Sequence, residues 1–255
     1  MTPAARISAA ISLIDRIQAG ALADRVLTDW GRKNRYAYSK DRAAIGDIVY
    51  DVLRKKQSCA SLGGGETGRA LLLGYIRDGG QDPATVFGAD QYAPSKLSDE
   101  ELSLVQSAPI RSNESRDFPE WLWPDLMRSH QYNAQAIALA MQDRAPVHLR
   151  VNLMKLNREE AITALADEGV ICKPLTLSPS ALQVVDGARK IRNSRSYQNG
   201  AVELQDASSQ AVADMVPLKQ GETLLDFCAG AGGKVLAVVT ARSACFLHMT
   251  SINAE

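Results

Sequence analysis

The chain has 255 residues, of which 45% are hydrophobic and 23% are charged. This composition is typical of a soluble globular protein and excludes a disordered or fibrous one, and the length admits one large domain or about two to three small ones. The formal net charge is zero, so any binding of nucleic acid must come from local basic patches.

The four cysteines are scattered along the chain and form no Cys-x-x-Cys pair. Their spacing argues against a zinc site or a disulfide framework and suits a reducing cytoplasm. No apolar run approaches the roughly 18–20 residues of a membrane span, and the opening residues begin no signal peptide. We therefore expect a cytoplasmic protein that holds no metal and enters no membrane.

Residues 1–115 predict an all-helical domain. Thr2 and Pro3 offer an N-cap and a first-turn proline, and apolar residues then recur at helical spacing as far as Gly20. A second helix is expected over residues 21–30. The third helix has a single apolar stripe, formed by Ile45, Ile48, Val49, Val52 and Leu53.

Shorter signals complete this domain. Residues 63–65 are three glycines and predict a turn between helices, because no strand precedes them and no Gly-Lys-Ser/Thr follows. Asp82 and Pro83 form another cap with a first-turn proline, and Ser98 with Glu101 forms a capping box. Helix starts are therefore expected at both places.

Basic residues outnumber acidic ones between Arg32 and Lys56. Charged residues on a surface helix most often form a solvated face, and that interpretation is favoured for this stretch taken alone. A patch that contacts phosphate groups is the alternative.

A small α+β module is predicted for the middle of the chain. The alternation of residues 146–153 predicts a half-buried strand, with Leu149 and Val151 on one face and Arg150 on the other. Helices are expected over residues 134–142 and 159–167, and further strands over 170–175 and 181–185.

Two basic groups in this module are candidate RNA contacts. His148, Arg150 and Asn152 share the polar face of the first strand, which is either an RNA-reading surface or an ordinary solvent-exposed face of a sheet. A metal site is not expected at His148, because no other ligand residue stands at the spacing that a metal site requires. A denser basic run follows, made of Arg189, Lys190, Arg192 and Arg195. Tyr197 lies beside this run, which favours phosphate contact with base stacking, and a solvated loop is the competing interpretation.

A strand, a glycine-rich turn and a helix start are predicted near the end of the chain. The apolar run of residues 223–227 predicts a buried strand, and residues 234–239 begin a helix. In the turn between them, missing side chains let a ligand approach the backbone, and the first N–H groups of the helix point toward it. A tight turn that binds nothing is the alternative.

The spacing of the glycines and their neighbours distinguishes between the known kinds of glycine-rich binding turn. A phosphate-binding P-loop would need Gly where Cys228 stands and Ser or Thr where Val235 stands, and a dinucleotide fingerprint would need Gly at 235. The observed pattern is an acid, Asp226, followed by small residues at alternate positions. It resembles the first motif of class I S-adenosylmethionine-dependent methyltransferases, with Cys228 in place of the usual first Gly.

Three further stretches extend this resemblance. Cys followed by a small-residue pair and Gly-Gly-Lys is similar to the RsmB/NOP/Sun family of RNA cytosine-C5 methyltransferases, as are Gln-Asp-Ala-Ser-Ser at residues 205–209 and Leu-Arg-Val-Asn at 149–152. The helices around residues 41–54 resemble the NusB-like RNA-binding domain that precedes the catalytic domain in RsmB-type enzymes.

The resemblance implies a multi-domain architecture. A helical NusB-like RNA-binding domain would occupy residues 1–115, linker helices and an α+β RNA-binding subdomain 116–200, and the incomplete start of a Rossmann-like α/β methyltransferase domain 201–255. It also implies a monomer that acts on RNA, ribosomal before transfer RNA. S-adenosyl-L-methionine would be held by Cys228, Ala229, Gly230, Ala231, Gly232, Gly233 and Lys234.

No catalytic residue is assigned within the chain. Family members add a Cys thiolate to C6 of cytosine, which activates C5, and their cysteines lie in two later motifs that residues 1–255 do not contain. Cys228 lines the cofactor pocket in the family, Cys245 lacks the flanking pattern, and only Glu255 stands near the place of the ribose-binding acid. We therefore expect a C-terminally truncated member that is inactive alone and has an uncovered strand edge. A non-catalytic RNA-binding protein is the alternative.

Overall fold

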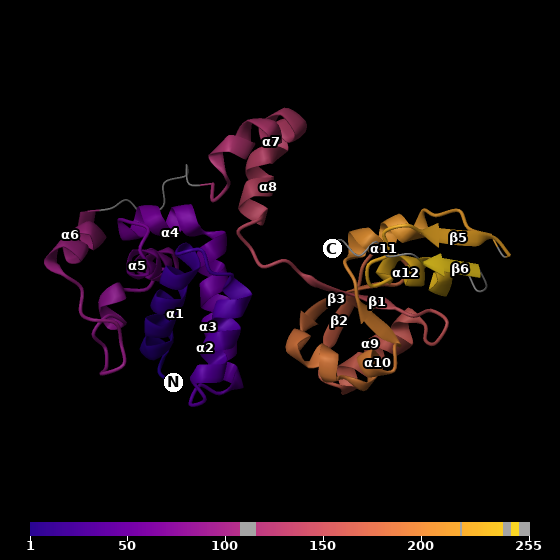
Figure 1. Ribbon diagram of the computed structural model, residues 1–255, viewed down its shortest axis with the longest axis horizontal. Coiled ribbons are helices and arrows are strands. Elements are labelled where there is room, and N and C mark those ends of the chain that lie inside the picture. The colour runs from indigo at the N-terminus through magenta and orange to yellow at the C-terminus, as the bar shows by residue number, and fades with distance from the viewer. Residues whose placement is uncertain (108–115, 220, 242–245, 250–255) are drawn as a thin grey trace. The chain divides into compact units, whose positions relative to one another are not determined.

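The chain divides near residue 144 into a helical unit and a unit that contains a sheet (Figure 1). The computed structural model describes residues 1–107, 116–219, 221–241 and 246–249. We call Met1–Arg144 the helical unit and Ala145–Glu255 the sheet unit. Among the helices of the described ranges, none combines the length and apolar character that a membrane crossing requires.

The helical unit begins with the helices that the sequence predicted. Thr2 accepts a hydrogen bond from the N–H of Ala5 and so caps the first helix, and Ser98 and Glu101 form the expected reciprocal bonds of a capping box. The helices are α1 (Pro3–Gln18), α2 (Ala23–Lys33), α3 (Ser39–Arg54), α4 (Lys56–Gly63), α5 (Gly68–Asp78) and α6 (Asp99–Ser107). A 3-10 turn, η1 (Pro83–Thr85), follows the cap at Asp82.

Apolar side chains from α1, α3 and α5 form the core of this unit. Leu13, Ile45 and Leu72 are completely buried, which confirms the stripe predicted for the third helix. The helices α4 and α5 approach closely at Gly74, where an added Cβ would lie 1.9 Å from the carbonyl oxygen of Cys59. The predicted turn is also confirmed, because Gly64 ends α4 with a φ of +75°.

An aromatic segment follows in the same unit. The rings of Phe118 and Trp123 meet edge to face with centroids 6.1 Å apart, and the guanidinium of Arg116 lies 4.1 Å from the centroid of Trp123. Asp117 fixes this segment to α4 by accepting from the N–H of Ser58 at 2.8 Å. The helical pieces here are η2 (Glu120–Leu122), α7 (Trp123–His130), η3 (Gln131–Asn133) and α8 (Ala134–Ala140).

The sheet unit contains an antiparallel sheet with the strand order β2-β3-β1-β4. Leu149 lies opposite Leu182 on one side and Leu204 on the other, and one face of the sheet packs on Leu165 of α9. The predicted strand–helix–strand–strand order is confirmed, and a fourth strand continues the sheet past residue 200. The elements are β1 (Val147–Val151), α9 (Arg158–Asp167), β2 (Ile171–Pro174), β3 (Ala181–Asp186), η4 (Ala188–Asn193), α10 (Arg195–Gln198) and β4 (Val202–Leu204).

A strand–helix–strand segment ends the described part of the chain. Strands β5 (Thr223–Asp226) and β6 (Phe246–Met249) pair in parallel, and α12 (Gly233–Ala241) connects them. The preceding α11 (Ala207–Asp214) packs against α12 through small apolar residues. NusB-like and Rossmann-like architectures remain predictions for the two ends of the chain.

Candidate functional site

The glycine-rich turn, residues 228–234, lies between a strand and a helix as predicted, but β5 is not the buried strand that its apolar run predicted, since Leu225 is 61% exposed. Gly230 and Gly232 have φ angles of +53° and +77°, which side chains with a Cβ rarely adopt. The carboxylate of Asp226 accepts from the N–H of Cys228 at 3.2 Å, and the N–H of Gly232 donates to the carbonyl of Ala229 at 2.7 Å. The turn is therefore held by its own backbone and by the acid at the end of β5.

The surroundings of this turn fit a ligand at its open side. No described atom lies within 4 Å of the place where Gly230 would carry a Cβ, and Cys228 and Lys234 are exposed. The first N–H groups of α12 have no acceptor within the helix, so they and the helix dipole favour a negatively charged group such as a carboxylate. The turn residues 228–234 can thus hold a cofactor, and that assignment remains a prediction.

Arg150 supports this turn from the sheet. Its Nη1 donates to the carbonyl oxygen of Gly233, the first residue of α12, at 2.6 Å, and to the side chain of Gln205 at 2.7 Å. Its Nη2 forms an ion pair with Glu203 of β4. One side chain from β1 therefore links the sheet to the start of α12, across 83 residues of sequence.

The sequence predicted that Arg150 would lie on an open polar face of β1. This prediction is wrong, because only 4% of Arg150 is exposed. The reason is that α11 packs against β1 and β3 and covers the face that the alternation left polar. Burial lowers the pKa of the Arg150 guanidinium, and the carboxylate of Glu203 opposes that shift. An RNA contact by Arg150 remains a prediction that this burial does not favour.

Gln210 is a second buried polar group at the same junction, and it is 1% exposed. Its amide oxygen accepts from the hydroxyl of Ser180 at 2.9 Å, and its Nε2 donates to the carbonyl oxygens of Leu149 and Gln205 at 3.2 and 3.0 Å. Every group of this amide that faces the sheet is satisfied. Gln210 therefore fixes α11 against β1 and β3.

The cap of α11 also contacts β1. Asp206 caps α11 by accepting from the N–H of Ser208 at 2.8 Å, and this bond holds the pKa of Asp206 below its ordinary value. The Nδ1 atom of His148 accepts from the N–H of Ala207 and lies 3.2 Å from the Asp206 carboxylate. His148 thus takes part in docking the helix against β1.

Sequence reasoning missed the roles of Glu203, Gln205 and Gln210. One signal was available: two long amide side chains, Gln205 and Gln210, flank the capping Asp206 in a helix start whose other residues are small. The family resemblance identified this stretch only by its position in the sequence, whereas the structure shows which contacts it forms. It carries the hydrogen bonds that join the sheet to α11 and, through Arg150, to α12.

The structure places the basic run on one short exposed segment, η4 and α10. Arg189, Lys190, Arg192 and Arg195 are all exposed. Beside them, Ser194 caps α10 by accepting from the N–H of Tyr197, and Glu168 accepts from the N–H of Arg195. Tyr197 itself is half-buried. These four cations are exposed at one surface, and their contact with RNA remains a prediction.

Two of the three described cysteines offer little nucleophilic chemistry. Burial raises the pKa of Cys59 to about 12 and that of Cys172 to about 11, so both remain protonated thiols at neutral pH. Cys228 is exposed at the glycine-rich turn. Cys245 and Glu255 lie outside the described residues.

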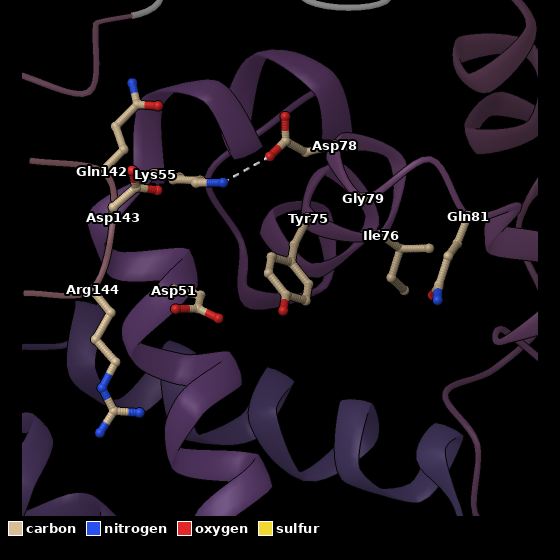
Figure 2. Close-up of a pocket in the computed structure, with 10 residues that line it drawn as sticks. All are labelled: Asp51, Lys55, Tyr75, Ile76, Asp78, Gly79, Gln81, Gln142, Asp143 and Arg144. Carbon is tan, nitrogen blue, oxygen red and sulfur yellow. Dashed lines mark hydrogen bonds and ion pairs between the residues drawn. The ribbon is translucent and has the colours of Figure 1, made fainter. Parts of the chain in front are cut away.

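The helical unit also contains a polar cavity of about 410 Å³ between α3, α5 and the segment that follows α8 (Figure 2). Lys55 and Asp78 form an ion pair of 3.2 Å at its wall, and Arg144 pairs with Asp47 at 3.2 Å. Burial, followed by the charge of Asp51, raises the pKa of Tyr75. The first pair joins the end of α3 to α5, and the second links the segment near residue 144 to α3.

Comparison with known proteins identifies one stretch of the chain directly. The ferredoxin-like domain of RsmF/B-like methyltransferases matches residues 118–190. The match includes the first three strands of the sheet and ends before the glycine-rich turn.

Curated relatives carry the name ribosomal RNA small subunit methyltransferase B. The protein of that name from Citrobacter koseri is 33% identical over 123 residues, which are 48% of this chain and 28% of the relative. The one from Photorhabdus laumondii is 30% identical over 121 residues, again 48% of this chain and 28% of the relative. This chain therefore matches less than a third of the length of either relative.

A solved structure of PH0851 superposes on 94% of this chain and 61% of its own with a TM-score of 0.60 and 18% identity. At that identity the likeness shows the fold alone. Together, the RsmF/B-like domain and the named relatives confirm the predicted family resemblance to RsmB-type RNA methyltransferases.

Proposed function

We propose that this protein acts in the methylation of ribosomal RNA, on C5 of a cytosine, with S-adenosyl-L-methionine as the methyl donor. The observation that carries the proposal is the hydrogen bond from Arg150 to the carbonyl of Gly233. Through it, the sheet whose first three strands match the RsmF/B-like domain holds the glycine-rich turn, whose spacing resembles the first motif of class I methyltransferases. The names of the relatives support RNA as the substrate.

The glycine-rich turn, the basic run and Arg150 have distinct roles in this proposal. Residues 228–234 bind the cofactor, which supplies an activated methyl group when bound. Their backbone N–H groups and the start of α12 orient its carboxylate. Arg189, Lys190, Arg192 and Arg195 bind RNA phosphates. Arg150 acts as a positioning residue that fixes the turn relative to the sheet.

We expect residues 1–255 to bind the cofactor and RNA without transferring a methyl group. Cytosine-C5 methylation needs a thiolate to add to the base. Among the described cysteines, Cys59 and Cys172 stay protonated, and Cys228 lies in the turn assigned to the cofactor. Incubation with tritiated cofactor and ribosomal RNA should leave the RNA unlabelled; labelled RNA would show that a catalytic group has been overlooked.

Calorimetric titration with S-adenosylhomocysteine tests the cofactor assignment. Gly230→Val should weaken binding by about tenfold or more, because a branched side chain both strains a φ of +53° and fills the open side of the turn. Gly221→Val is the matched control, since Gly221 also has a positive φ of +84° and no described atom within 4 Å of an added Cβ. Equal effects of the two variants would argue against a cofactor at this turn.

A non-catalytic RNA-binding protein is the second candidate, and the exposed basic run favours it. On that hypothesis the chain binds RNA with an affinity that falls steeply with salt, and S-adenosylhomocysteine has no measurable affinity. Cofactor binding that Gly230→Val weakens would exclude it.

A further inference from the structure

The side-chain amide of Gln205 is a polar group that the sheet unit uses only in part. Gln205 stands between β4 and α11, and both sides of its main chain are fixed. Its N–H donates to the carbonyl oxygen of His148 at 3.3 Å, and its own carbonyl oxygen accepts from Nε2 of Gln210 at 3.0 Å. The main chain of Gln205 is therefore held by β1 and by α11, and its side chain starts from a fixed point.

Arg150 sets the orientation of this amide. The amide oxygen of Gln205 accepts from Nη1 of Arg150 at 2.7 Å. A guanidinium carries donors and no acceptor, so the oxygen of the amide, and not its nitrogen, must face Arg150. Arg150 is itself buried and is held by Glu203 and by the carbonyl oxygen of Gly233. Nε2 is therefore the one group of the Gln205 amide that remains for another partner.

Nε2 of Gln205 lies at the start of α12. It is 3.6 Å from the place where Gly233, the first residue of that helix, would carry a Cβ. Among the residues that the structure describes, Nε2 has no acceptor. Because Gln205 is only half-buried, a ligand can reach this donor and replace water there.

The surroundings of Nε2 favour an acceptor that carries negative charge. The first N–H groups of α12 have no acceptor within the helix, and the helix dipole places positive charge at the same end. Two acids of this region are already engaged, since Asp226 accepts from the N–H of Cys228 at 3.2 Å and Glu203 pairs with Arg150. Gln205 therefore adds an oriented donor to the backbone donors at the start of α12.

We propose that Nε2 of Gln205 donates to the carboxylate at the amino-acid end of S-adenosyl-L-methionine, and that Arg150 acts through Gln205 by orienting its amide. A carboxylate has two acceptor oxygens, so it can accept from a side-chain amide and from a backbone N–H at once. The adenosine part of the cofactor offers these donors no negative charge. The contact rests on the proposed function, because it takes the glycine-rich turn as the cofactor site. Gln205 then favours a cofactor that has its amino-acid end.

Calorimetric titration of the full chain with two ligands tests this contact. S-adenosylhomocysteine has the amino-acid end, whereas 5′-methylthioadenosine has the same adenosine and thioether without it. Gln205→Glu keeps an oxygen for Arg150 and replaces the amide donor with an oxygen that repels a carboxylate. It should weaken the binding of S-adenosylhomocysteine by about thirtyfold, as expected when a hydrogen bond to a charged group is lost, and leave the affinity for 5′-methylthioadenosine unchanged.

Two further variants control this measurement. Gln205→Met keeps the length of the side chain and adds no charge, so it should weaken the binding of S-adenosylhomocysteine by about tenfold and again spare 5′-methylthioadenosine. Gln198→Glu makes the same change of charge at an exposed residue of α10, and it should bind both ligands like the unchanged chain. Urea unfolding checks the fold, and Gln205→Glu should unfold at the same midpoint because Arg150 keeps its acceptor.

Three results would overturn the contact. Equal losses of affinity for the two ligands in both Gln205 variants would mean that Gln205 shapes the turn and does not touch the carboxylate. Unaltered binding of S-adenosylhomocysteine in both variants would exclude the contact as well. If the unchanged chain bound the two ligands equally, the turn would still hold the adenosine part, but the contact would be absent.

Binding of neither ligand by the unchanged chain would exclude the cofactor itself together with the contact. That result distinguishes failure of the proposed function from failure of the contact at Gln205 alone. The comparison of Gly230→Val with Gly221→Val does not involve Gln205, so it tests the cofactor assignment separately.

Discussion

The core of the helical unit and the junction of the sheet with α11 and α12 are built from opposite kinds of contact. In the helical unit, Leu13, Ile45 and Leu72 are fully buried among other apolar side chains. At the junction, Arg150 and Gln210 are also buried, but each forms hydrogen bonds with several partners. Apolar packing is non-directional, whereas hydrogen bonds fix both distance and angle. The first kind of contact therefore stabilises a unit, and the second sets the position of the glycine-rich turn.

The largest expected effect is in the apolar core. Leu72→Ala should lower the free energy of unfolding of the helical unit by about 2–5 kcal/mol, because it removes buried methyl groups and leaves a cavity. Urea unfolding combined with hydrogen exchange of peptides from each unit measures this change. The exchange of residues 226–241 should remain that of the unchanged chain; faster exchange there would mean that packing in the helical unit also positions the turn.

At the junction, Arg150→Met should cost about 2–3 kcal/mol in the sheet unit, since it leaves Glu203, Gln205 and the carbonyl of Gly233 without their donor. The cost is below that of a fully buried pair because the side chain of Glu203 is 42% exposed. Hydrogen exchange of residues 232–238 should become faster, whereas a substitution in the apolar core of the helical unit is not expected to change it.

Two variants refine that measurement. Arg150→Lys keeps the charge but not the planar fork, so it should restore only part of the lost stability and leave the exchange near Gly233 raised. Arg128→Met breaks an exposed ion pair with Asp125 and should change stability by less than about 1 kcal/mol. If Arg150→Lys behaved like the unchanged chain, the directional role assigned to Arg150 would be wrong.

The smallest effect concerns pH. The hydroxyl of Ser196 donates to Glu168, and this bond holds the pKa of Glu168 below its ordinary value. Since the folded-state pKa lies below the unfolded one, the bond stabilises the fold above a pH of about 4 and its contribution is lost as the pH falls through the folded-state pKa. Ser196→Ala should therefore reduce the loss of stability on acidification, measured by urea unfolding at a series of pH values. An unchanged pH dependence would contradict the assignment.

The elements that the sequence predicted correctly depend on local signals. The capping box of Ser98 and Glu101 is present in full, and the apolar stripe of α3 faces the core. Alternation along β1 also identified which residues share a face. It did not reveal that α11 covers the second face, because that depends on residues about sixty positions away. The buried role of Arg150 has the same origin, since its partner Gly233 is 83 residues distant.

The buried amide of Gln210 limits how this protein can be recombined with its relatives. A chimera with a crossover between β3 and α11 would take Ser180 and Leu149 from one parent and Gln210 from the other. Unless both parents share that hydroxyl and amide, the grafted helix would bury a polar group without a partner. Successful crossover points are therefore expected before Val147 or after Asp214, where the sheet and α11 are inherited together.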